Sequence, residues 1–159
     1  MNRRKVRKKM EIRNKQTGRV LLSIDGTSLR GADLRKENLR EANLREADLR
    51  GCDLRGSTLY EADLYQANLG EADLRGCDLR GCALCGAELC GCDLREAELC
   101  GADLQRTDLR GSDLRGSDLR NADLRKTDLC GARINATQKA MLLKALGLII
   151  IAESEVSPK

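Results

Sequence analysis

The segment 27–56, TSLRGADLRKENLREANLREADLRGCDLRG, contains a leucine at every fifth position. The spacing continues without a miss from Leu29 to Leu129, twenty-one leucines in all, and Ile24 and Ile134 extend it at both ends. An α-helix would spread residues at this spacing around its whole circumference. A continuous strand would turn them to alternate faces. The period therefore predicts a short extended stretch followed by a corner, repeated many times.

Each five-residue unit has the same order of residue types around its leucine. A small residue stands two positions before the leucine, as at Ala32, Ala42 and Cys52. The small residue and the leucine share one face of a short strand, so both are expected to point inward and to fill a narrow interior. A polar residue, most often Asp, lies between them and points outward, and an outward arginine usually follows the leucine. The next position is rich in glycine, which suits a corner.

This pattern resembles that of the pentapeptide-repeat family, A(D/N)LXX, in units such as CDLRG at 52–56 and SDLRG at 112–116. The resemblance extends from about Thr27 to Ile134. It implies an all-β fold, a right-handed quadrilateral β-helix with four repeats in each coil and about five and a half coils. Glu37 departs from the pattern because it places a carboxylate at an inward position. Since an unpaired buried carboxylate is costly, we expect Glu37 to reach water at an open N-terminal coil.

The flanks of the repeat region differ from it in composition. Residues 10–13 and 19–24 are joined by a turn-rich segment, which predicts a hairpin that covers the first coil. Thr137 is expected to cap a helix over 138–146, and a short strand is expected over 148–152. The predicted organisation is a disordered basic tail (1–9), an N-terminal β cap (10–26), the repeat β-helix (27–136) and a C-terminal cap of helix and strand with a tail (137–159).

The composition argues against an enzyme. The chain has no histidine, so general acid–base chemistry would fall to carboxylates on convex faces, without a cleft to shift their pKa values. We therefore predict no catalytic residues and no cofactor. The N-terminus lacks the apolar core of a secretory signal, and the apolar run 140–152 is too short to span a bilayer. These features predict a cytoplasmic protein that does not enter a membrane.

Basic residues are concentrated at the N-terminus. Residues 1–18 carry eight basic groups and one acidic group, a net charge of +7. The whole chain carries +4, so the remainder carries −3. The basic tail is expected either to be solvated or to make a weak contact with the phosphates of a nucleic acid.

Eight cysteines raise the question of disulfides or a metal site. With four repeats in each coil, residues stacked in neighbouring coils differ by twenty in sequence, and no two cysteines do. Cys82 and Cys85 have CxxC spacing, but one is expected to point inward and the other outward. We therefore expect reduced thiols and no metal. The expected inward cysteines, which act as slightly larger alanines, are Cys52, Cys77, Cys82 and Cys92, and the outward ones are Cys85, Cys90, Cys100 and Cys130.

The twenty-residue stacking predicts columns of like residues on the outer faces. One face has an aspartate column beside an arginine column, beginning at Asp33 and Arg35. Stacked carboxylates about 4.8 Å apart repel one another, and the neighbouring arginines relieve this repulsion. This face is therefore interpreted as self-neutralised and solvated. Some members of the family resemble duplex DNA and act on DNA gyrase, which requires a strongly acidic surface, so the arginines weaken that alternative.

The arginine columns are interrupted at mid-height on two adjacent faces. The interruption predicts a patch of low charge. It is interpreted either as the place where a protein partner docks or as drift among tolerant outward positions. The residues of this candidate protein-binding patch are Tyr65, Gly70, Ala83, Cys85, Cys90 and Gln105.

Apolar residues cover more of the C-terminal helix than one packing stripe needs. One side is expected to close the last coil, and the surplus is expected to meet a second chain in a homodimer. The candidate dimer contacts are Met141, Leu142, Leu143, Leu146, Ile149 and Ile150. Taken together, the sequence predicts a non-enzymatic rigid scaffold or protein-binding module whose protein partner it does not name, with modulation of DNA gyrase as the alternative.

Overall fold

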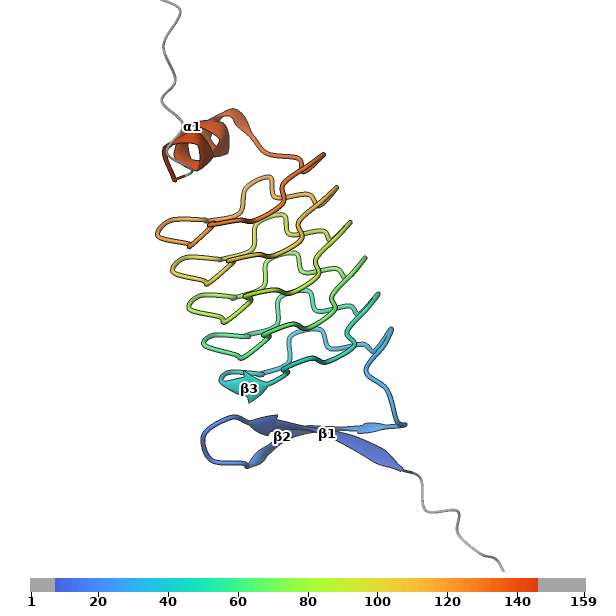
Figure 1. The fold of residues 1–159 in the computed structure, drawn as a ribbon. Coiled ribbons are helices and arrows are strands. Elements are labelled where there is room, and N and C mark those ends of the chain that lie inside the picture. The colour runs from blue at the N-terminus through green and yellow to red at the C-terminus, as the bar shows by residue number, and fades with distance from the viewer. Residues whose placement is uncertain (1–7, 146–159) are drawn as a thin grey trace, which may run out of the picture.

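The computed structural model describes residues 8–145, which form a stack of coils with a β-hairpin at one end and a helix at the other (Figure 1). The hairpin joins β1 to β2, and the short strand β3 lies in the first coil beside β1. The helix α1 follows the last coil. The bounds are Lys9–Asn14 for β1, Val20–Asp25 for β2, Ala42–Asn43 for β3 and Ala136–Ala145 for α1.

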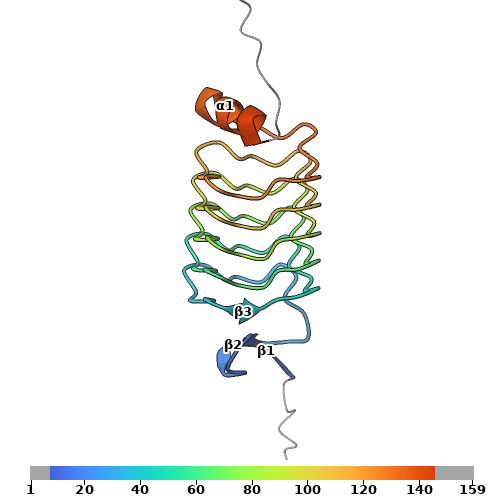
Figure 2. The same ribbon diagram turned by 60° about the vertical axis from the view of Figure 1, so that its left-hand side comes forward.

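Residues twenty apart in sequence lie in neighbouring coils. A parallel β-bridge joins Asp33 to Asp53, and the same spacing recurs at every fifth residue until Asp113 pairs with Arg133. Since each repeat has five residues, twenty residues make one coil of four repeats, as predicted. The coils lie regularly above one another when the stack is turned (Figure 2).

Most backbone hydrogen bonds of the stack run between coils. The Leu54 N–H donates to the Asp73 carbonyl at 2.8 Å, and the Asp73 N–H donates back to the Cys52 carbonyl at 2.9 Å. At the following corner the Gly56 N–H donates to the Arg75 carbonyl at 3.0 Å. Because these groups find partners only in the adjacent coil, a single coil is not expected to be stable alone.

The leucines fill the interior of the stack, as their spacing predicts. Every leucine of the period from Leu29 to Leu124 is buried, whereas Leu129 in the last coil is only partly buried. Glu37 is half-exposed in the first coil, which agrees with the expectation that its carboxylate reaches water. The core is thus one continuous apolar column whose coverage is weakest at its ends.

The inward cysteines do more than fill space. The Cys77 thiol donates to the Leu54 carbonyl at 2.7 Å, and the other three inward cysteines make the same contact with the leucine 23 residues earlier. The Thr107 hydroxyl contacts the Leu84 carbonyl in the same way. Burial raises the pKa of Cys77 to about 11, so the thiol keeps the proton that it donates. The prediction that these cysteines act as larger alanines was therefore incomplete, because each also joins its coil to the preceding one.

The predicted N-terminal hairpin is confirmed. β1 and β2 pair antiparallel, and Ile12, which lies opposite Leu22, is buried. Lys9 belongs to β1 rather than to the predicted basic tail. Lys8 is also described, and its carbonyl accepts the Gly26 N–H at 2.8 Å, whereas residues 1–7 of that tail lie outside the described residues.

The helix α1 begins with a capping box that the sequence analysis missed. The side-chain oxygen of Asn135 accepts the Gln138 N–H, and the side-chain oxygen of Gln138 accepts the Asn135 N–H, both at 2.9 Å. This reciprocal pair satisfies two backbone donors at the start of the helix. The prediction that Thr137 caps the helix was wrong, and the helix begins at Ala136, two residues earlier than expected.

Two side chains of α1 contact the last complete coil. The Gln138 amide donates to the carbonyls of Leu114 and Ser117, and Leu142 is buried in the core of its own chain. Leu142 therefore belongs to the side of α1 that faces the coil, and its assignment as a dimer contact stays a prediction. Leu143 is half-buried. The side chain of Met141, the residues Leu146, Ile149 and Ile150, and the expected strand over 148–152 lie outside the described residues, so the homodimer stays a prediction.

Every corner requires a residue in the left-handed region. Gly76 has φ +63° and a β-carbon there would meet no atom within 4 Å, so the space around this corner is open. Among residues 8–145, ten non-glycine residues adopt the same conformation, including Asn121 with φ 59°. The preference for glycine at this position therefore comes from the backbone angle rather than from crowding.

Replacing Gly76 tests this explanation. Gly76→Ala is expected to destabilise the protein by about 1 kcal/mol, because alanine disfavours positive φ while its side chain has room. Gly76→Asn is the control, since asparagine tolerates this conformation and already occupies it at position 121. The midpoint of urea unfolding is the measurement. An asparagine variant that loses as much stability as the alanine variant would contradict the backbone explanation.

Candidate functional site

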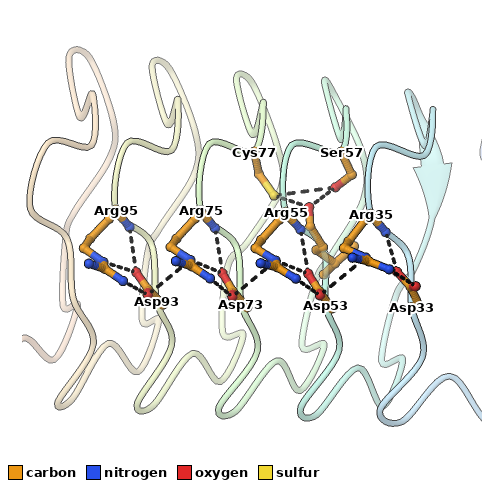
Figure 3. Close-up of polar contacts among 11 residues, drawn as sticks. Asp33, Arg35, Asp53, Arg55, Ser57, Asp73, Arg75, Cys77, Asp93 and Arg95 are labelled. Atoms are coloured by element: carbon orange, nitrogen blue, oxygen red, sulfur yellow. Dashed lines mark hydrogen bonds and ion pairs between the residues drawn. The ribbon is translucent and has the colours of Figure 1, made fainter.

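One face of the stack is a continuous ladder of ion pairs (Figure 3). The Arg55 guanidinium donates through Nε and Nη2 to the Asp53 carboxylate at 2.8 and 2.5 Å, and its Nε lies 3.6 Å from Asp73 in the next coil. The same arrangement recurs in the coils above and below. We call this the ladder face, and its residues are Asp33, Asp53, Asp73, Asp93 and Asp113 with Arg35, Arg55, Arg75, Arg95 and Arg115.

The arginines of the ladder face lower the pKa of the carboxylates at its two ends. Hydrogen bonds from Arg35 hold the pKa of Asp33 at about 2, and hydrogen bonds from Arg115 hold the pKa of Asp113 at about 2. Each carboxylate therefore faces a guanidinium rather than an unscreened carboxylate of the next coil. The interpretation of this face as self-neutralised is confirmed.

Where a repeat has no arginine after its leucine, an arginine of the preceding coil can pair with the acid of that repeat. Asp63 is followed by Tyr65 instead of arginine, and Arg45 of the preceding coil pairs with Asp63 at 3.0 Å. Glu98 is followed by Cys100, and Arg80 of the preceding coil approaches Glu98 at 3.0 Å. An acid that stands directly before the leucine of a repeat thus stays paired as long as an arginine follows the leucine either in its own repeat or in the repeat one coil below.

Glu88 and Asp103 meet neither condition. Glu88 has Cys90 after the leucine of its own repeat and Gly70 at the same position one coil below, and it accepts a hydrogen bond from the Asn68 amide instead of a guanidinium. Asp103 has Gln105 after the leucine of its own repeat and Cys85 at the same position one coil below, and it accepts the backbone N–H of Gln105 at 3.0 Å. Within residues 8–145 neither carboxylate has an ion-pair partner within 4 Å. The gap in the arginine columns therefore leaves two acids without an ion pair within 4 Å, and only the longer-range attraction of Arg50 for Glu88 and of Arg125 for Asp103 remains.

The predicted patch is assembled around this gap. The corner N–H of Gln66 donates to the Cys85 carbonyl at 3.1 Å and that of Gly86 donates to the Gln105 carbonyl at 2.9 Å, which places Tyr65, Cys85 and Gln105 in one column. On the adjacent face Gly70 lies below Cys90, since the Glu71 N–H donates to the Cys90 carbonyl. Ala83 lies between Asp63 and Asp103 in the neighbouring column. The six residues are thus adjacent in space, although the flanking Glu88 and Asp103 make the patch less neutral than predicted.

Gly70 forms a shallow hollow in the patch. Arg50, Glu71, Glu88 and Cys90 line it. A β-carbon at Gly70 would lie 3.3 Å from the Asn68 side-chain oxygen and 3.8 Å from the Arg50 side chain. Cys90 is exposed and Cys85 is half-buried, so both sulfur atoms are near the surface. Gly70 occupies the position after the leucine where most repeats have an arginine, so the missing side chain leaves the hollow.

Both tyrosines stack against arginines of the preceding coil. The Arg45 guanidinium lies 4.4 Å from the ring centre of Tyr65, and that of Arg40 lies 4.3 Å from the ring centre of Tyr60. The Arg80 guanidinium of the following coil also lies near Tyr60, 5.5 Å from its ring centre. Such contacts hold the rings against the surface. Tyr65 therefore forms a fixed edge of the patch. Tyr60, which the sequence analysis did not single out, lies on another face.

Among residues 8–145 no group of three or more His, Cys, Asp or Glu could hold a metal ion. All eight cysteines are free, with Cys82 buried and Cys85 nearer the surface, as the register predicts. Over the same part of the chain, none of the helices has the length and apolar character needed to cross a bilayer.

Comparison with known proteins identifies the family. The model of pentapeptide repeats matches in eight copies, over residues 23–59, 38–76, 77–116 and 97–135. These matches span more than half of the chain, which therefore belongs to the pentapeptide-repeat family. The family fold, a right-handed quadrilateral β-helix, agrees with the coil of four repeats that the β-bridges define.

Several solved structures are similar to this chain. The pentapeptide repeat protein Rfr23 from the cyanobacterium Cyanothece 51142 is 34% identical, with 61% of this chain and 63% of that chain covered and a TM-score of 0.49. This chain thus spans less than two thirds of Rfr23. A trypsin-treated form of QnrB1, a plasmid-mediated fluoroquinolone resistance protein, is 25% identical, with 78% and 70% covered and a TM-score of 0.49. A pentapeptide repeat protein from the Arabidopsis thaliana thylakoid lumen is 24% identical, with 74% and 78% covered and a TM-score of 0.47. No curated protein sequence matches.

Acid is expected to weaken the ladder face. The folded-state pKa of Asp113 is depressed to about 2 from 3.8, so the ion pair stabilises the protein above pH 4 and this contribution is lost as the pH falls from 4 towards 2. Arg115→Gln is expected to lower the unfolding midpoint at pH 6, with the difference from wild type shrinking towards pH 2. Arg106→Gln is the control, because Arg106 is an exposed corner residue without an ion pair among the described residues. Equal losses for both variants at pH 6 would contradict a specific role of the ladder.

Proposed function

We propose that the protein is a rigid, non-enzymatic module that binds a protein partner through the patch around Cys85 and Cys90. The observation that carries this proposal is the gap in the guanidinium columns, where Glu88 and Asp103 have no cation within 4 Å. On the ladder face, by contrast, each aspartate is already paired with an arginine. A partner gains little by approaching a surface whose charges are satisfied, and more by supplying groups to one whose charges are not.

The surroundings of the patch support rigid presentation of its side chains. The Cys85 and Gln105 carbonyls each accept a backbone N–H from the coil below, and stacking under Arg45 holds Tyr65. Side chains that are already ordered lose little conformational entropy when a partner binds. The hollow at Gly70 adds a recess for a protruding group of the partner.

The proposal also includes the cellular compartment of the protein and the role of the helix α1 at the last coil. We place the protein in the cytoplasm, where its eight free thiols would stay reduced. We assign to α1 the role of a cap, because the last coil of a solenoid exposes unpaired strand edges. Gln138 and Leu142, which contact the coil beneath, would supply the polar and apolar parts of that cap.

Modulation of DNA gyrase is the less favoured function. Mimicry of duplex DNA needs rows of unpaired negative charge, whereas Asp53, Asp73 and Asp93 on the ladder face are each paired with an arginine. The two unpaired acids of the patch, Glu88 and Asp103, are too few to form such rows. The surface chemistry therefore favours recognition of a protein at a local patch.

Filling the gap with arginine tests the proposed function. Cys85→Arg combined with Cys90→Arg restores the residue type that the repeat uses at these positions, so the fold is expected to persist while the patch is blocked. Cys130→Arg is the matched control, because Cys130 is exposed and stands two coils beyond Cys90 in the same column. In pull-downs from the native host, wild type and the control are expected to capture the same partner and the double variant to lose it. Equal capture by all three proteins, or by none, would contradict the proposal.

A further inference from the structure

Tyr60 is packed between arginines of the two neighbouring coils. The Arg40 guanidinium of the preceding coil lies 4.3 Å from the ring centre, and the Arg80 guanidinium of the following coil lies 5.5 Å from it. The Arg80 guanidinium also pairs with Asp78 in its own repeat at 2.8 Å and approaches Glu98 of the next coil at 3.0 Å. A guanidinium on the upper side of a tyrosine, which is the side of the following coil, is thus held by the ring and by carboxylates.

Tyr65 stands one repeat after Tyr60 and has, within residues 8–145, an arginine on its lower side only. The Arg45 guanidinium of the preceding coil lies 4.4 Å from its ring centre. In the following coil, Cys85 occupies the position that is an arginine above Tyr60, and Ala83 occupies the position of the aspartate. Both short side chains are half-buried. The upper side of the Tyr65 ring is therefore open to a group from outside the chain.

Asp103 lies one coil above Ala83, to which a parallel β-bridge joins it. The Oδ1 atom of Asp103 accepts the Gln105 N–H at 3.0 Å, whereas its Oδ2 atom has no hydrogen-bond or ion-pair partner among residues 8–145. Arg125, which attracts Asp103 at longer range, donates to Asp123 at 2.9 and 2.6 Å. The half-buried carboxylate of Asp103 therefore has an oxygen available to a donor from another molecule.

We propose that the upper side of Tyr65 binds an arginine side chain of the protein partner. The guanidinium stacks on the ring and donates to the Asp103 Oδ2 atom. These are the two kinds of contact that Arg80 makes with Tyr60 and Glu98. This proposal rests on the function proposed above, because it names the group that the partner brings to the patch. The receiving surface is called the Tyr65 shelf and consists of Tyr65, Ala83, Cys85 and Asp103.

The chemistry of the Tyr65 shelf favours arginine over lysine. A planar guanidinium can lie on a ring and still donate from its edge to a carboxylate, whereas the ammonium of lysine is a compact and strongly hydrated charge. A second guanidinium on one ring is compatible with the fold, since Tyr60 already lies between two. Arg45 is fixed by Asp63 at 3.0 Å, so the Tyr65 ring is supported from below before a partner binds.

A peptide titration of the full chain tests the arginine contact directly. The probes are the capped tripeptides Gly-Arg-Gly and Gly-Lys-Gly at low salt, and the measurement is the NMR shift of the backbone amides of Cys85 and Gln105. The arginine peptide is expected to move both signals and to saturate, and the lysine peptide is expected to bind several-fold more weakly. No saturable shift with the arginine peptide, or equal binding of the two peptides, would overturn the proposal.

Neutralising Asp103 removes the charged half of the contact. Asp103→Asn is expected to weaken binding of the arginine peptide about tenfold, because a charge-assisted pair is lost. The fold is expected to persist, since Asn68 accepts the Gly70 N–H in the same way at 3.0 Å. Asp93→Asn is the matched control, because it makes the same change of charge two repeats away, where Arg95 already pairs with the carboxylate. Equal weakening by both substitutions would show that the contact is not local and would overturn the proposal.

Cys85→Arg fills the Tyr65 shelf from within the chain. The new guanidinium is expected to take the place of the peptide, so that peptide binding is lost while the urea midpoint of unfolding does not fall. Cys85→Ser leaves the shelf open, and this control is expected to bind the peptide as wild type does. A Cys85→Arg protein that still binds the arginine peptide would also overturn the proposal.

Failure of the arginine contact and failure of partner binding give different results. If the peptide does not bind while the double variant Cys85→Arg and Cys90→Arg loses the partner, the arginine contact is overturned and the proposed function stands. If the peptide binds as expected while the pull-downs show equal capture, the proposed function is contradicted and the Tyr65 shelf stands as a site for arginine.

Discussion

Hydrogen bonds between coils that are twenty residues apart hold this molecule in register. From Leu34 to Leu114 each leucine N–H of the period donates to a carbonyl of the next coil, as Leu54 does to Asp73, and the returning N–H groups donate to the coil below. These bonds form only when the corners bring the chain back to the same side, so five-residue repeats in groups of four are the condition for all of them. Burial of the leucines and the inward thiol contacts follow from this register, because it places every leucine over the leucine twenty residues before it.

The same register organises the outer surface. It converts a short repeated sequence into columns, and a column of one charge would repel itself at the spacing of a β-sheet. The ladder face avoids this by alternating Asp and Arg within and between coils, as at Asp53, Arg55 and Asp73. The surface becomes distinctive where the alternation fails, around Gly70, Cys85 and Cys90. The regular parts of the molecule therefore provide stability, and recognition is proposed at the irregular part.

The sequence predicted the fold and the columns well, because a strict period of five leaves few arrangements that bury every leucine. The sequence did not predict correctly which of two suitable side chains caps the C-terminal helix. Asn135 and Thr137 both suit a helix cap, and the contacts of Gln138 with the coil beneath accompany the choice of Asn135. The sequence indicated that the inward cysteines are slightly larger than alanine. It did not indicate that each thiol would donate to the carbonyl of the leucine 23 residues earlier. Tyr60 was missed because arginines stand above and below it, so its column did not look interrupted. Glu88 and Asp103 were missed because the reach of an arginine into the next coil depends on side-chain geometry.

The central claim is that the chain alternates inward and outward positions around a filled square coil. Alkylation of the eight cysteines in the native protein, followed by peptide mass spectrometry, tests it most directly. Cys52, Cys77, Cys82 and Cys92 are buried, and burial raises the pKa of Cys82 and Cys92 to about 12, so these four thiols are predicted to stay unmodified until the protein is unfolded. Cys85, Cys90, Cys100 and Cys130 are predicted to react in the folded state. Native modification of the first four at rates like those of the second four would contradict the account.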